Sequence, residues 1–110
     1  MRESTTISVE LNTEWRGEFS AEPYEGAWAS EAIYFIRALE SKEVPGAANA
    51  RVQISPDGMN WCDEGTLIRL PAAPGITFAR VNHFGGWLRL VGTLPDEAHM
   101  KVIVHLVLKA

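Results

Sequence analysis

The sequence has one cysteine and no long apolar segment. Cys62 is the single cysteine of the 110 residues, so neither an internal disulfide nor a cysteine-based zinc cage can form. No apolar run approaches the ~20 residues that a membrane helix requires, and residues 1–20 lack the apolar core of a signal peptide. We therefore expect a soluble protein that does not contact a membrane, with Cys62 buried as a small hydrophobic side chain.

The sequence also lacks the arrangements that carry most enzyme chemistry. It has no Gly-x-Ser-x-Gly elbow, and no histidine near Cys62 in the sequence could activate the thiol. His99 and His105 share one face of an expected strand but would lie ~20 Å apart, too far to bind one metal ion. His83 lies in a glycine-flanked turn, where a local hydrogen bond explains it. We therefore expect no enzyme activity, no metal and no cofactor.

Positive charge is also scarce. The formal net charge is −4, and residues 1–43 hold nine Asp and Glu against four Arg and Lys, whereas residues 44–110 hold five against six. A basic surface for nucleic acid is therefore not expected. The acidic residues can form a solvated N-terminal region, or they can dock on a less acidic neighbour, because complementary charge guides the register of an assembly.

The clearest positive signal is the stretch Arg51-Val-Gln-Ile-Ser-Pro-Asp-Gly-Met-Asn-Trp61. Val52 and Ile54 alternate with polar residues, which is typical of a half-buried strand. Proline, aspartate and glycine then suit successive positions of a tight turn. The pattern predicts a β-hairpin, assigns Asp57 to the turn and makes Trp61 a core anchor beneath it.

Short strands recur between turn signals along the rest of the chain. Thr5–Leu11 alternates, and His99–Lys109 is the strongest strand, with its even-numbered apolar residues on one face. Residues 27–40 permit a helix by propensity. Their dense run Ile33-Tyr-Phe-Ile36 instead favours a strand buried on both faces. We predict an all-β, antiparallel, jelly-roll-like β-sandwich in one domain, with residues 1–28 as an extended arm or first strand plus loop and residues 29–110 as the core.

Four tryptophans exceed what a core of this size needs, so at least one is a candidate surface anchor. Trp87 and Arg89 are two residues apart on an expected strand and therefore share a face. If they point outward, they form an aromatic and guanidinium patch suited to a sugar or a partner protein, to which Trp28 or Tyr24 could contribute. If they point inward, Arg89 needs an acidic partner such as Asp63 or Glu64.

Parts of the sequence resemble known β-sandwich proteins. Residues 52–61 are similar to a hairpin of discoidin-like, galactose-binding-type jelly rolls, and Trp87-Leu-Arg-Leu90 resembles their returning strand. Residues 55–61, 84–90 and 102–109 together resemble short bacterial and phage-associated β-sandwich proteins. The first resemblance implies glycan binding. However, discoidin domains are longer and often close with a disulfide, which a single cysteine forbids, and no residue of their ligand-binding loops has a match here.

Two hypotheses about function follow. The first is a non-catalytic structural or interaction module, a small subunit of a multimeric assembly such as a phage-like particle, either cytoplasmic or particle-associated, whose partner is a second copy or another assembly protein. Four features support it: no catalytic residues were found, there are more tryptophans than the core needs, the N-terminal region is acidic, and the last strand has apolar residues on both faces. The second hypothesis is a discoidin-like carbohydrate-binding module that uses Trp87 and Arg89, with Trp28 or Tyr24.

Overall fold

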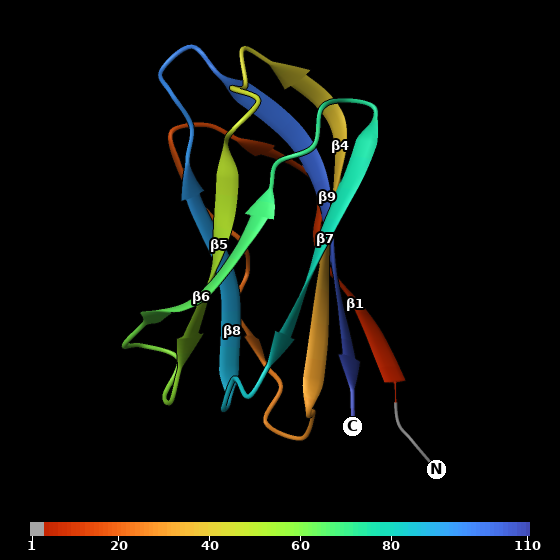
Figure 1. Ribbon diagram of the computed structural model, residues 1–110, viewed down its shortest axis with the longest axis vertical. Coiled ribbons are helices and arrows are strands. Elements are labelled where there is room, and N and C mark those ends of the chain that lie inside the picture. Colours follow the sequence, from red (N-terminus) through yellow and green to blue (C-terminus); the bar gives the residue numbers. More distant parts are fainter. Residues whose placement is uncertain (1–3) are drawn as a thin grey trace.

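The computed structural model describes residues 4–110, which form two antiparallel β-sheets packed face to face (Figure 1). Sheet A has the strand order β1-β9-β4-β7; sheet B has the order β2-β8-β5-β6, and the short β3 also pairs with β8. The strands are β1 (Ser4–Trp15), β2 (Glu18–Ser20), β3 (Tyr24–Glu25), β4 (Glu31–Lys42), β5 (Asn49–Ser55), β6 (Cys62–Arg69), β7 (Gly75–Asn82), β8 (Trp87–Thr93) and β9 (His99–Lys109). With β2 and β3 counted as one interrupted strand, this is the eight-stranded, two-sheet order of a jelly roll. The predicted all-β sandwich is confirmed.

The core lies between the two sheets and follows the alternation of the strands. In β9 the side chains of Val102, Val104, Leu106 and Leu108 are fully buried, whereas the intervening residues are half-buried on the outer face of sheet A. β9 lies between β1 and β4 (Figure 1), and with the equally buried Met100 this one strand contributes five apolar side chains to the core.

The ambiguous segment 27–40 forms a strand from Glu31 onward, as favoured. β4 pairs with both β7 and β9, and Tyr34 and Ile36 are completely buried on its inner face. The expectation that this strand is buried on both faces is wrong, because Ile33 and Phe35 point to the outer face of sheet A and are half-exposed. No other part of the described chain is packed over them.

Residues 4–28 contribute strands to both sheets. β1 pairs with β9 along the edge of sheet A, and β2 and β3 pair with β8 in sheet B. Trp15 and Phe19 are buried and their rings stack with centroids 4.1 Å apart. A side chain at Gly92 would collide with the Phe19 ring. Residues 1–3, which were included in the expected arm, lie outside the described part of the chain.

The regular alternation expected for Thr5–Leu11 ends at two register shifts. The pairing of β1 with β9 is interrupted between Ser8 and Glu10 and again between Glu10 and Thr13. Ile7 and Val9 pack against the core, but Leu11 is 67% exposed. An extra residue in one strand turns the following side chain to the other face, which local alternation does not reveal.

Candidate functional site

The turn after β5 is held by its own side chains. The hydroxyl of Ser55 accepts hydrogen bonds from the backbone N–H groups of Asp57 and Gly58, at 3.2 and 2.8 Å. One carboxylate oxygen of Asp57 accepts the N–H groups of Met59 and Asn60, both at 2.9 Å. The hydrogen bonds that the Asp57 carboxylate accepts, from the Asn60 backbone first and then from the Met59 backbone and the Asn60 and Ser55 side chains, hold the pKa of Asp57 well below its usual range. The geometry supports the interpretation of Asp57 as a turn residue.

This turn lies against Trp87. Gly58 has φ of +78°, and a Cβ atom there would lie 3.0 Å from the Trp87 indole. In β8 the side chains of Leu88 and Leu90 are fully buried in the core. Trp87 and Arg89 alternate with these leucines and therefore point to the outer face of sheet B. The glycine backbone therefore packs on the Trp87 ring.

Arg89 is paired with the other tryptophan of the hairpin. Its guanidinium carbon lies 4.2 Å from the centroid of Trp61, and its Nε and Nη2 donate to Oε1 of Gln53 at 2.9 and 2.7 Å. The aromatic and guanidinium pair is therefore formed by Trp61 with Arg89. Trp61 is half-exposed on this outer face, so the expectation that it anchors the core is wrong.

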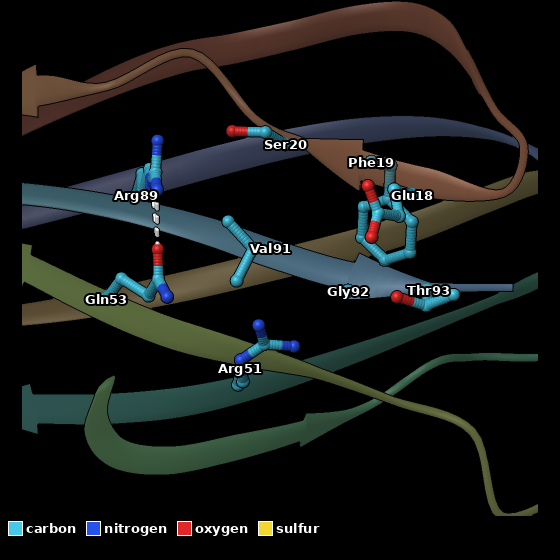
Figure 2. Close-up of a pocket in the computed structure, with 9 residues that line it drawn as sticks. All are labelled: Glu18, Phe19, Ser20, Arg51, Gln53, Arg89, Val91, Gly92 and Thr93. Carbon is cyan, nitrogen blue, oxygen red and sulfur yellow. Dashed lines mark hydrogen bonds between the residues drawn. The ribbon is translucent and has the colours of Figure 1, made fainter. Parts of the chain in front are cut away.

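A shallow groove of about 400 Å³ begins beside Arg89 and crosses the outer face of sheet B (Figure 2). We call it the sheet B groove; its floor includes Val91, which is 8% exposed. Asp63 accepts hydrogen bonds from Arg51 Nε at 3.1 Å and from Gln53 Nε2 at 3.0 Å, and these two bonds lower the pKa of Asp63. The groove is lined by Glu18, Phe19, Ser20, Arg51, Gln53, Arg89, Val91, Gly92 and Thr93.

The other residues considered as a site lie elsewhere. Tyr24 pairs with Leu88 and packs against the core, and Trp28 is 42% exposed in the connection between β3 and β4. Sequence reasoning missed Arg51 and Gln53 as site residues. Their alternation with buried Val52 places them on one face, but only the pairing of β5 with β8 brings that face beside Arg89.

Cys62 is exposed, which corrects the expectation that it is buried. It is the first residue of β6, and its thiol donates a hydrogen bond to the Ile54 carbonyl, with the sulfur 3.8 Å from the oxygen. Cys62 and His83 line the same small cavity of about 260 Å³. Their proximity could not be predicted from the sequence, because the two residues are far apart in the chain. Neither in this cavity nor anywhere else in residues 4–110 do three His, Cys, Asp or Glu side chains lie where they could hold a metal ion.

Sheet A carries a second distinctive surface on its outer face. Phe35 and Phe78 are paired across β4 and β7 with ring centroids 5.9 Å apart, and Phe78 and Ile76 are 51% and 59% exposed. The guanidinium carbon of Arg80 lies 5.1 Å from the centroid of the Phe78 ring. By strand alternation and register, the apolar patch consists of Ile33, Phe35, Ile76, Phe78, Ile103 and Val107.

Charge is divided between this patch and the strands at the far edge of the sheets. Arg37 and Arg80 lie among the patch residues on the outer face of sheet A, and Lys101 and Lys109 lie at its two ends. Two acidic residues share this face: Glu31 is opposite Lys109, and Glu40 pairs with Lys101 at 3.7 Å. β1 and the β2–β3 segment are joined by a hydrogen bond from the Glu22 N–H to Glu10, at 2.9 Å. This region, the acidic edge, holds Glu10, Glu14, Glu22 and Glu25, and Arg16 pairs with Glu14.

Residues 4–110 contain no helix long and apolar enough to cross a membrane.

Comparison with known proteins shows a shared fold without a shared sequence family. No family model matches the chain, and no curated protein matches its sequence. The fold is similar to that of the SPBc2 prophage-derived protein YomS, with a TM-score of 0.65 and 8% identity over 100% of this chain and 96% of that one. A chain from the disulfide-linked pili of Bacillus endospore appendages has a TM-score of 0.49 and 9% identity, over 99% of this chain and 85% of that one. CpGH89CBM32-5 from Clostridium perfringens, in complex with GalNAc-β-1,3-galactose, has a TM-score of 0.43 and 12% identity over 94% of each chain.

These identities are too low to transfer a function. The similarity to YomS bears on the fold and agrees with a small antiparallel sandwich. The similarity therefore shows the fold of this chain and nothing about its ligands or partners.

Proposed function

We propose that the protein is a non-catalytic interaction module that assembles through the outer face of sheet A. The apolar patch carries this proposal, because its members extend across three neighbouring strands and two of its large side chains, on the edge strand β7, are more than half exposed. Contiguous exposed apolar surface on a small protein marks an interaction site.

The occupant of the patch is a second copy of this chain. Basic side chains outnumber Glu31 and Glu40 on the face that carries the patch, and the acidic edge of the same molecule has the complementary charge. A contact between the patch of one copy and the acidic edge of the next is head-to-tail, and such contacts generate rings or filaments. Two patches facing each other would instead place Arg37 and Arg80 of both copies in one interface, where like charges repel.

A repeating head-to-tail contact suits a small subunit of a larger assembly. We assign that assembly to a phage-like particle, in keeping with the prophage origin of YomS, whose fold the chain shares.

Replacing Phe78 with serine tests the apolar contact. We expect the wild-type protein to sediment as oligomers across the micromolar range, and Phe78→Ser to shift the distribution to monomer, because a large exposed aromatic side chain of the interface is lost. The matched control is Leu67→Ser, which changes a side chain that is 60% exposed on β6 of the other sheet. A wild-type monomer at high micromolar concentration, or equal effects of both variants, would contradict the proposal.

A charge exchange tests the head-to-tail arrangement. Arg37→Glu and Glu22→Lys should each weaken association alone, because each places like charges across the contact. An equimolar mixture of the two variants should recover association, since the new glutamate at position 37 of one variant then faces the new lysine at position 22 of the other. If the mixture remains as dissociated as its components, the acidic edge is not the occupant of the patch.

A further inference from the structure

We infer that the sheet B groove is a saccharide-binding site that accepts one or two neutral sugar residues. It lies on the opposite sheet from the apolar patch, so the inference does not depend on the proposed assembly. It also lies on a sheet face, away from the loop ends of the sandwich that the discoidin-like resemblance would imply.

One wall of the groove presents hydrogen-bond donors. Arg89 uses Nε and Nη2 on Gln53, which leaves the N–H groups of Nη1 for another acceptor. Arg51 uses Nε on Asp63 and keeps both terminal nitrogens. In Figure 2 the guanidinium of Arg51 points toward Val91, and the free end of Arg89 points toward Ser20.

The other wall presents acceptors. Ser20 and Glu18 stand on β2, and Thr93 lies opposite Glu18 on β8. Among the described residues, no side chain or backbone group donates a hydrogen bond to the Glu18 carboxylate. A ligand that bridges the two walls must therefore accept from the arginines and donate to Glu18, and a sugar hydroxyl does both.

The donors are fixed before a ligand arrives. The hydrogen bonds from Arg51 to Asp63, from Gln53 to Asp63 and from Arg89 to Gln53 form one continuous chain. The indole of Trp61 supports the other side of Arg89. Immobilised side chains lose less entropy on binding, so this network favours recognition of a small polar molecule.

Charge and size select the class of ligand. The two arginines are balanced by Glu18 and Asp63, so the groove has no excess positive charge with which to select an anion. Its volume of about 400 Å³ lies within the range of small-molecule sites. Val91 offers an apolar floor for the C–H groups of a sugar ring, in place of an aromatic platform.

A glycan array that displays neutral and uronate-containing oligosaccharides tests this inference. We expect neutral oligosaccharides to be retained, and Arg51→Met to lower their affinity at least ~10-fold, because a hydrogen bond from a charged donor is lost. The matched control is Arg69→Met, which removes an exposed arginine of the same sheet outside the groove and should leave retention unchanged. Comparison of the melting temperatures of both variants with that of the wild type verifies folding.

The position of the site is tested on the wild-type protein. Titration with the best-retained array oligosaccharide should shift backbone amide resonances of residues 18–20, 51–53 and 89–93. Shifts confined to other strands would overturn the assignment, as would an array on which no glycan is retained. Retention of uronates alone would also overturn it, because that result defines an anion site.

Discussion

At the scale of the residue, the turn between β5 and β6 determines what the two neighbouring tryptophans can contact. Gly58 covers the Trp87 ring, and Arg89 covers one face of Trp61. Neither indole therefore offers this outer face a fully open aromatic platform. The inferred recognition in the adjacent groove depends instead on planar polar side chains, of which Arg89 and Gln53 are joined by two hydrogen bonds.

Replacing Gly58 with valine should destabilise the protein by about 1–2 kcal/mol, since a β-branched residue resists positive φ and the new Cβ would crowd Trp87. Urea unfolding measures the change. Gly46→Val is the control, because a Cβ at that position would have no atom within 4 Å beyond its chain neighbours. Equal midpoints for the two variants would mean that the turn tolerates a side chain at position 58.

The carboxylate of Asp57 should make the hairpin sensitive to acid. Its folded-state pKa is lowered by the N–H groups that it accepts, so the stability that it contributes is complete above the ordinary Asp pKa of about 3.9 and is lost as the pH falls toward the lower folded-state value. The difference in urea midpoint between the wild type and Asp57→Ala should therefore narrow below pH 4. A difference that is constant or widens on acidification would show that ionisation of Asp57 does not support the turn.

At the scale of the element, alternation along each strand separates the core from the two outer surfaces. β9 supplies the clearest case, because its even-numbered residues fill the centre and its odd-numbered residues face outward. This division was readable from the sequence. Alternation failed at Leu11, because the two irregularities in β1 depend on its pairing with β9 and have no local signal.

Leu106→Ala should cost about 2–5 kcal/mol of unfolding free energy, because the side chain is completely buried and its loss leaves a cavity. The neighbouring Val107→Ala is the comparison, since Val107 points to the half-exposed face of the same strand. Chemical denaturation of both variants should show a much larger loss for Leu106. A loss below about 1 kcal/mol at Leu106 would place its face outside the tightly packed core.

At the scale of the whole molecule, the sandwich presents two chemically different outer faces. Sheet A offers an apolar patch on a face where basic residues outnumber acidic ones, and sheet B offers a polar groove held by a hydrogen-bond network. A chain that assembles through one face can therefore still bind a small ligand with the other. The Phe78 and Arg51 variants separate these roles, because each changes one face and leaves the buried layer between them intact.

The sequence by itself determined the β class, the hairpin, the burial pattern of β9 and the shared face of Trp87 and Arg89, because all of these depend on local alternation and turn chemistry. Tertiary structure alone decided that this face points outward and that Arg89 meets Gln53 and Trp61. It also decided that Phe35 lies beside Phe78, and that β1 to β3 gather acidic residues at one edge. These contacts join residues far apart in the chain, and the pairing order of the strands, which no short segment encodes, brings them together.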